Sequence, residues 1–191
     1  MSSSLILASA SPRRLELLRQ IGIEPRVCAV DIVECQTELE SAAEYSRRIA
    51  RDKAVAGRAL CADNVDNWVL GADTEVVVDG LPLGKPQDPE DALRMLRLLS
   101  GREHQVLSSV ALIGPHFDEV MLQSTSVRMA RIAAAEMQAY VESGEPFGKA
   151  GAYAIQGRAA CFIASIAGSY SGVMGLPLFE TATLLRRVGL I

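Results

Sequence analysis

The order of apolar and amphipathic segments along the chain constrains its fold more than any single motif does. Short runs with strand character, such as residues 4–8 and 68–72, alternate with segments whose apolar residues recur at helical spacing, such as residues 12–21. Hairpin signals are interspersed among them, and no internal repeat or low-complexity tract interrupts the 191 residues. This alternation predicts an α/β protein whose sheet is mixed and not uniformly parallel.

The first predicted strand runs directly into a helix whose opening turn carries two arginines. Ser11 is suited to cap this helix and Pro12 to be its first residue. Arg13 and Arg14 therefore fall where unpaired amides already make the potential positive, so a cation costs up to about 1 kcal/mol and an anion gains a similar amount. The segment predicts a phosphate site at the helix start; the alternative is two solvated arginines on an exposed helix end.

A second helix is predicted over residues 41–60, opened by the capping box formed by Ser41 and Glu44. Its apolar positions share one face: Tyr45, Ile49, Ala56 and Leu60. Lys53 falls on the same face, so its stem should start inward. We expect the ammonium group either to reach an anion in a cleft or to snorkel along the apolar surface to solvent.

Asp73 ends an apolar strand, and ligands of α/β proteins gather at such strand ends. A turn or capping aspartate is the alternative. The Asp79-Gly80 pair predicts a two-residue hairpin turn in which Thr74 faces Lys85. Strict alternation then puts Asp73 on the opposite face from Lys85, so these two side chains are expected to meet only at the rim of the sheet.

Two further groups of residues suggest ligand binding. Asp31 and Glu34 follow another predicted strand, and together with Asp73 they are suited to one hard divalent cation such as magnesium; loop carboxylates are more often solvated surface groups. Lys149 and Gln156 lie in a glycine-rich stretch where the backbone can approach a ligand closely. A glutamine amide both donates and accepts, which suits a nucleobase edge.

Composition excludes several classes of partner. The net charge of −4 argues against a nucleic-acid coat or an anionic membrane surface, so a phosphate ligand must be held by local cations. We find no secretory signal and no apolar stretch near the ~20 residues of a membrane span. The four cysteines form no CxxC pair, which favours reduced thiols and a cytoplasmic protein: Cys28, Cys35, Cys61 and Cys161.

Several segments, in this order, resemble the Maf family of nucleotide pyrophosphatases: LASASPRR at 7–14, Lys53, GADT at 71–74, GKP at 84–86, the block at 149–157, GSY at 168–170 and GLPLFE at 175–180. The resemblance implies a hydrolase that cuts a nucleoside triphosphate to the monophosphate and pyrophosphate. The motif at 151–157 is similar to the branch acting on dTTP and UTP. The resemblance further implies an elongated mixed sheet flanked by helices, with two lobes and a cleft between them, a single domain over residues 1–191, and a homodimer.

Residue roles follow from the resemblance position by position. Asp73 would be the catalytic carboxylate, and Lys53 and Lys85 the catalytic lysines that bind phosphates. Asp73 and Glu34 would hold a divalent cation, magnesium or manganese. The substrate would be bound by a larger set, of which Arg13, Thr74 and Gln156 match positions associated with base choice: Ser9, Arg13, Arg14, Thr74, Lys149 and Gln156.

Three departures from the family pattern stand out. Val33 replaces an acid of the loop that usually reads Asp-x-Asp-Glu, Glu75 stands where an apolar residue is usual, and Met129-Ala130 replaces Phe-Arg. The predicted chemistry is metal-assisted hydrolysis at the α-phosphorus with Asp73 as general base. Two other readings are a non-catalytic nucleotide sensor that regulates cell division and an enzyme that transfers the nucleotide to an acceptor.

Overall fold

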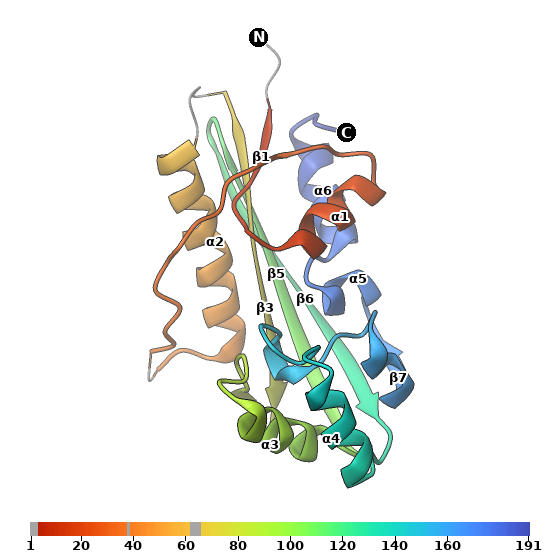
Figure 1. Cartoon of the computed structure of the whole chain (residues 1–191). Coiled ribbons are helices and arrows are strands. Elements are labelled where there is room, and N and C mark those ends of the chain that lie inside the picture. Colours follow the sequence, from red (N-terminus) through yellow and green to blue (C-terminus); the bar gives the residue numbers. More distant parts are fainter. Residues whose placement is uncertain (1–3, 38, 62–65) are drawn as a thin grey trace.

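The computed structural model describes residues 4–37, 39–61 and 66–191, and one mixed sheet runs through nearly its whole length (Figure 1). The strand order is β2-β1-β3-β5-β6-β7, with β4 paired to β3. The strands are β1 (Leu5–Leu7), β2 (Arg26–Val27), β3 (Trp68–Val78), β4 (Leu81–Pro82), β5 (Glu103–Gly114), β6 (Phe117–Met129) and β7 (Ile163–Ala167). Only the β1–β2 and β1–β3 pairs are parallel, which confirms the predicted mixed sheet.

Helices cover both faces of this sheet (Figure 1). They are α1 (Pro12–Gln20), α2 (Ala42–Cys61), α3 (Pro89–Leu99), α4 (Ala134–Glu142), α5 (Tyr170–Met174) and α6 (Leu178–Arg187), with two 3-10 turns at Ala150–Ala152 and Arg158–Phe162. Among the described residues, none of these helices has the length and apolar character needed to cross a membrane.

One face of the sheet carries two separate apolar clusters. The α1/α6 cluster packs β3 and β5 residues against helices α1 and α6: Leu70, Ala72, Val110 and Leu112 lie beneath Leu17, Leu18, Leu184 and Leu185. The α3/α4 cluster does the same farther along the same strands: Val76, Val78 and Val106 lie beneath Met95, Leu96, Met137 and Tyr140. Between the clusters each strand places one polar residue on this face, Thr74 in β3 and its register partner Ser108 in β5. The apolar alternation is therefore interrupted once on each strand, at paired positions, and this interruption divides the face into two lobes.

The opposite face of β3 packs against α2, and Gly71 sets the distance between the strand and the helix. A Cβ atom at Gly71 would lie 2.2 Å from the carbonyl oxygen of Ala50 and 3.0 Å from the Cβ of Ala54, both in α2. Only a residue without a side chain allows the helix to approach this closely. The contact brings the turn of α2 from Ala50 to Ala54, which carries Lys53, against the part of β3 that carries Asp73.

Several local predictions are confirmed. Glu44 accepts from the Ser41 amide at 2.9 Å and Ser41 Oγ accepts from the Glu44 amide at 3.3 Å, so the capping box of α2 is present. The hairpin pairs Val78 with Leu81, as the turn predicted. Asp88 as a cap, Pro89 after it and the apolar spacing that follows predict a further helix with four inward residues, and α3 buries all four: Ala92, Met95, Leu96 and Leu99.

Other predictions are wrong. Leu60 was expected on the buried face of α2 but is 69% exposed, because the inward stripe shifts to Ala54 and Gly57. The sequence pattern predicts separate strands at 68–72 and 76–78, but these residues form the single strand β3. It also predicts a strand at 161–166, but a 3-10 turn extends to Phe162 and β7 starts only at Ile163. Helix α5 was not predicted. Ser11 precedes α1 as expected, but its side chain makes no capping hydrogen bond.

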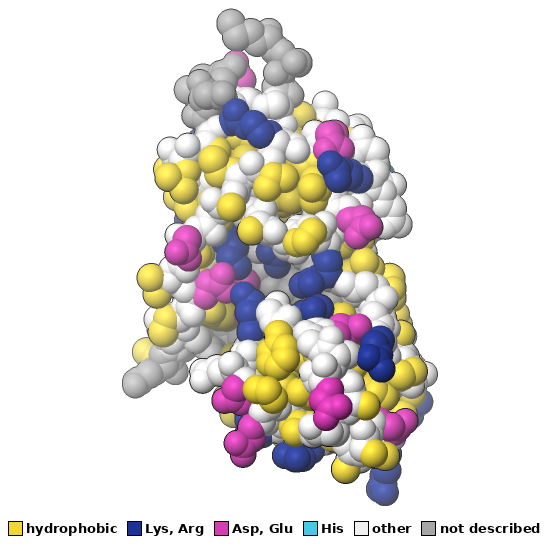
Figure 2. Space-filling model, viewed as in Figure 1, with side chains coloured by type: hydrophobic (Ala, Val, Ile, Leu, Met, Phe, Trp, Pro, Cys, Tyr) yellow, Lys and Arg dark blue, Asp and Glu magenta, His cyan; other side chains and the backbone are white. Residues whose placement is uncertain are grey.

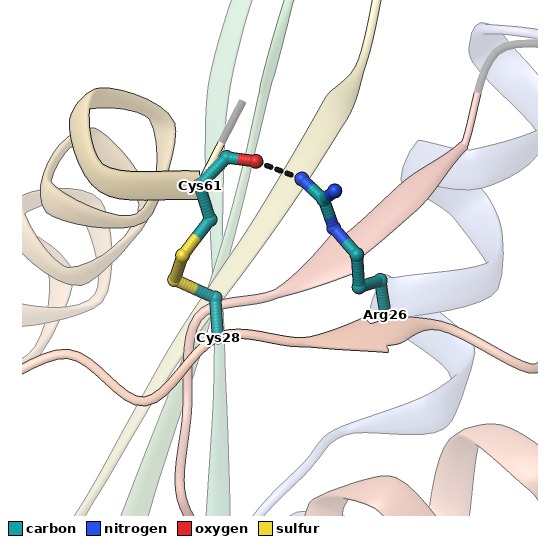
Figure 3. The surroundings of a disulfide bond; sticks show 3 residues. All are labelled: Arg26, Cys28 and Cys61. Atoms are coloured by element: carbon teal, nitrogen blue, oxygen red, sulfur yellow. Dashed lines mark hydrogen bonds between the residues drawn. A yellow bond between two sulfur atoms is a disulfide. The ribbon is translucent and has the colours of Figure 1, made fainter. Parts of the chain in front are cut away.

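The expectation of four reduced thiols is corrected. Cys28, which follows β2, and Cys61, the last residue of α2, form a disulfide with a Cα–Cα distance of 6.3 Å (Figure 3). Arg26 donates a hydrogen bond to the carbonyl oxygen of Cys61 beside it. Cys35 and Cys161 are free and exposed. The sequence shows no CxxC spacing because the bond joins the segment after β2 to the end of α2, at a sequence separation of 33.

Candidate active site

A cavity of about 630 Å³ lies between the two lobes, and it collects nearly all of the predicted site residues. Figure 2 shows lysine, arginine and acidic side chains gathered around a hollow that crosses the middle of the molecule. The predicted residues that line the cavity come from six separate segments: Arg13, Arg14, Glu34, Lys53, Asp73, Thr74, Lys85, Lys149 and Gln156. Ser9 and Asp31 are not among the lining residues.

Lys53 links two carboxylates at the α2 side of the cavity. Its Nζ donates to Asp73 Oδ1 at 2.9 Å and lies 3.0 Å from Glu34 Oε1. Lys53 is 8% exposed and Asp73 3%, whereas the Glu34 side chain keeps 34% of its surface accessible. The lysine therefore points inward as the anion-binding interpretation required, and the snorkelling alternative is wrong. Asp73 Oδ2 is buried and has no hydrogen-bond partner.

The surrounding charges shift the pKa values of two glutamates in opposite directions. Burial alone would raise the pKa of Glu34, but the positive charges of Lys53, Lys85 and Arg14 lower it below the ordinary value. Glu75 lies two residues after Asp73 on the same face of β3 and is 7% exposed. Burial, followed by the negative charges of Asp73 and Glu34, raises the pKa of Glu75 to about 8.

The start of α1 contributes two arginines with different surroundings. Arg14 Nε donates to the carbonyl oxygen of Gly175 at 2.9 Å, and Arg14 Nη1 donates to Ser9 Oγ at 3.2 Å. Burial lowers the pKa of Arg14, and the neighbouring Arg13 lowers it further, although Asp73 and Glu34 oppose the shift. Ser9 thus holds Arg14 in place at the cavity wall. Arg13 lines the cavity itself.

The glycine-rich stretch that carries Lys149 and Gln156, and the segment after β4, form the remaining wall of the cavity. Lys149 Nζ donates to the carbonyl oxygen of Glu145 at 2.5 Å, and burial and then the charge of Arg13 lower the pKa of Lys149. The Gln156 side chain is exposed at the cavity wall. Lys85 follows β4 beyond the last ladder pair. Asp73 does not end a strand as expected: it lies in the middle of β3, paired with Ser109, and both it and Lys85 line the cavity.

A hydrogen-bonded network fills the polar gap between the two lobes. Ser108 Oγ donates to the carbonyl oxygen of Gly172 at 2.6 Å and lies 3.1 Å from Thr74 Oγ1. Thr74 Oγ1 lies 3.3 Å from the carbonyl oxygen of Gly175. These contacts fasten α5 and the following turn against β3 and β5. Gly175 has a φ of 124°, which side chains rarely adopt, so a glycine is needed where the turn presents its carbonyl oxygen to Thr74 and Arg14.

Sequence reasoning gave no role to Ser108, to Tyr45 or to the Gly175 carbonyl oxygen. The sequence does show Ser108 as a single polar residue in an otherwise apolar alternation. Its role can be recognised only once the pairing of β5 with β3 is known. Tyr45 lines the cavity and is buried, which raises its pKa. Of the three departures, Val33 is exposed and Met129 is buried in the α3/α4 cluster, whereas Glu75 lines the cavity.

The carboxylates of the cavity suit a divalent cation that takes only one or two ligands from the protein. Within the described part of the chain, no three His, Cys, Asp or Glu side chains are grouped closely enough to form a metal cage of their own. Asp73 and Glu34 both reach the same lysine nitrogen, and Asp73 Oδ2 is a buried oxygen without a partner. In enzymes that act on phosphates, magnesium is usually bound by one or two carboxylates together with the phosphates of the substrate.

The chain matches one family model and several proteins that share a name. Residues 4–188 match the family model described as Maf-like protein. A protein of Bordetella pertussis named dTTP/UTP pyrophosphatase is 53% identical over 194 residues, covering 97% of this chain and 93% of the relative. Proteins of the same name from Methylococcus capsulatus and Shewanella oneidensis are 50% and 48% identical, covering 97% and 98% of this chain and 91% and 100% of the relatives.

Proposed function

Because this chain belongs to the Maf family, we propose that it hydrolyses dTTP and UTP to the nucleoside monophosphate and pyrophosphate. The observation that carries the proposal is the Lys53 bridge between Asp73 and Glu34 inside a cavity lined by further cations. Carboxylates and several lysines and arginines in one cavity suit a metal-assisted reaction of a polyphosphate.

The cations would bind the triphosphate. Arg13, Lys53 and Lys85 come from three different segments and line the same cavity, so together they can neutralise the substrate and the departing pyrophosphate. Losing one such charge-assisted contact costs about 1.5–3 kcal/mol, or roughly 10- to 150-fold in rate or affinity. Each lysine should therefore be important and none should be indispensable on its own.

Asp73 would act as the general base. Its Oδ1 is fixed by Lys53 while the buried Oδ2 has no hydrogen-bond partner, so the carboxylate is held in place and Oδ2 is the oxygen left to take a proton. The water oxygen forms the new bond to the α-phosphorus, its proton passes to Asp73, and the bond from the α-phosphorus to the bridging oxygen of pyrophosphate breaks. A divalent cation bound by Asp73 and Glu34, magnesium or manganese, would supply charge neutralisation at the phosphates.

The proposal also covers the cellular location of the protein, the extent of its functional unit and its oligomeric state. A cytoplasmic location is supported by the substrate class, since nucleoside triphosphates are made and used there. A single functional unit over residues 1–191 is supported by the sheet that continues through both lobes. Self-association into a homodimer stays a prediction of the family resemblance.

The test is a substrate panel with magnesium that measures monophosphate, diphosphate, pyrophosphate and orthophosphate separately. We expect dTTP and UTP to give monophosphate and pyrophosphate in equal amounts. Release of orthophosphate with dTDP would place the cleavage at the wrong phosphorus and refute the proposal. Asp73→Asn should reduce kcat by at least about 100-fold. Asp79→Asn, in the exposed hairpin turn outside the cavity lining, is the matched control and should keep wild-type turnover.

A further inference from the structure

Residues 148–156, all of them described in the structure, form the wall segment of the cavity and carry Lys149 and Gln156 to it. Regular structure in the wall segment is limited to the 3-10 turn at Ala150–Ala152. Its glycines are free to adopt many backbone conformations. The position of the wall segment must therefore be fixed by contacts with residues outside it.

Glu145 supplies these contacts at both ends of the wall segment, although it is not among the cavity-lining residues. Its carboxylate accepts from the Tyr140 hydroxyl at 2.9 Å and from the Arg158 and Ala159 amides at 3.0 and 3.4 Å. Its carbonyl oxygen accepts from Lys149 Nζ at 2.5 Å. One residue thus binds the start of the wall segment and the turn that follows its end.

The Glu145 carboxylate caps the 3-10 turn Arg158–Phe162. This turn begins after Gly157, which has no side chain to accept the first amides, and Glu145 accepts them instead. Burial alone would raise the pKa of Glu145, but the Arg158 amide and the Tyr140 hydroxyl lower it below its ordinary value. The carboxylate is therefore ionised at neutral pH, and hydrogen bonds to an ion are roughly twice as strong as neutral ones.

Two further features tie the carboxylate to the residues around Gln156. A Cβ atom at Gly157 would lie 2.3 Å from Glu145 Oε1, so the glycine leaves the space that the carboxylate fills. The Tyr140 hydroxyl that donates to Glu145 also accepts from the Ala154 amide at 3.3 Å, and Ala154 lines the cavity. Gln156 is therefore held on both sides by a network that ends at one carboxylate.

We infer that Glu145 is a positioning residue for substrate binding, because it holds the wall segment so that Lys149 and Gln156 face the bound nucleotide. Asp73 and Lys53, the groups proposed to act on the phosphates, lie on β3 and α2 instead. Loss of the Glu145 contacts should therefore weaken binding and leave the chemical step unchanged. The inference rests on the proposed function, since it places the nucleotide in this cavity.

The experiment measures kcat and KM for dTTP with magnesium in wild type and in Glu145→Gln. Glutamine keeps the shape of the side chain but turns one acceptor oxygen into an NH₂ group that faces a donor. We expect KM to rise about tenfold, the value of one hydrogen bond to a charged group, with kcat unchanged. This split identifies lost binding. Partial unfolding would instead lower kcat and leave KM unchanged, because the molecules that stay folded bind normally.

Gly157→Ala tests the same contact from its other side. The φ of Gly157 is −104°, which alanine adopts readily, so the substitution acts through the new Cβ, which must displace the Glu145 carboxylate. We expect the same rise in KM. In a Glu145→Ala background the carboxylate is absent, and Gly157→Ala should then have no further effect on KM.

Glu142→Gln is the matched control. Glu142 is exposed in α4, three residues before Glu145, and accepts a hydrogen bond from Gln138 in the same helix at 2.9 Å. The substitution removes the same charge from the same part of the chain without touching the wall segment. We expect wild-type kcat and KM.

The outcomes separate the inference from the proposed function. A KM raised in Glu145→Gln and Gly157→Ala but not in Glu142→Gln supports the inference. An unchanged KM in Glu145→Gln, an equal rise in Glu142→Gln, or a further rise from Gly157→Ala in the Glu145→Ala background overturns it and leaves the function standing. Failure of wild type to cleave dTTP removes the proposed function and the inference with it.

Discussion

Replacing Glu75 by glutamine should stabilise the protein at neutral and alkaline pH. Burial and the nearby charges of Asp73 and Glu34 raise the pKa of Glu75 from 4.5 to about 8. Between these two pH values the folded protein binds a proton that the unfolded chain has lost, so the wild-type free energy of unfolding falls as the pH rises. At 1.36 kcal/mol per pH unit, the full interval amounts to about 5 kcal/mol, of which about 3 kcal/mol is lost by pH 7. Glutamine is neutral throughout and escapes this loss.

The assay is urea unfolding of wild type and Glu75→Gln at several pH values from about 4.5 to about 8, with the free energy extrapolated to water. The two free energies should agree at the acid end and diverge steadily toward the alkaline end. Glu90→Gln, an exposed carboxylate in the first turn of α3, is the control and should differ from wild type by a nearly constant amount. Parallel curves for wild type and Glu75→Gln would show that burial does not penalise the Glu75 charge, which refutes the reasoning.

Two further predictions concern stability. Reducing the Cys28–Cys61 disulfide, or replacing Cys61 by serine, should lower the free energy of unfolding by about 2–4 kcal/mol, because the bond closes a loop with a separation of 33 residues; identical urea midpoints with and without reductant would contradict this. Gly71→Ala should cost about 3 kcal/mol or more, because the new Cβ would lie 2.2 Å from the Ala50 carbonyl oxygen. If the Gly71→Ala variant unfolds at the same temperature as wild type, α2 can move away from β3 without loss of stability, and the prediction is wrong.

The features predicted correctly are those with local physical causes. The buried face of α3 follows from helical spacing and from Asp88, whose side chain accepts from the Asp91 amide at 2.8 Å. The hairpin follows from Asp79-Gly80, where both residues have positive φ values of 53° and 82°. In each case the deciding interaction joins residues a few positions apart, so the sequence pattern contains it.

The features that were missed depend on contacts between distant segments. Leu60 lies on the predicted stripe of α2, but the inward stripe shifts to Ala54 and Gly57, and the Leu60 side chain stays 69% exposed. The Cys28–Cys61 pair depends on where β2 lies beside α2. The charge environment of Glu75 depends on α2 covering that face of β3. Alternation along β3 puts Glu75 on the same face as Asp73, but a sequence pattern does not indicate how deeply both are buried.

The polar pair formed by Thr74 and Ser108 connects the architecture to the chemistry. Apolar residues at both positions would join the α1/α6 and α3/α4 clusters into one continuous core, and the sheet face would have no gap to seat a ligand. Two hydroxyls there must instead be hydrogen-bonded, and the acceptors that satisfy them are the Gly172 and Gly175 carbonyl oxygens beside the cavity. The same bonds that make a polar gap tolerable inside the sheet therefore fix the hydroxyl orientation at the cavity wall. Apolar substitutions at these two positions should change how the two lobes pack, whereas substitutions at the Lys53–Asp73 pair on the α2 side should lower turnover.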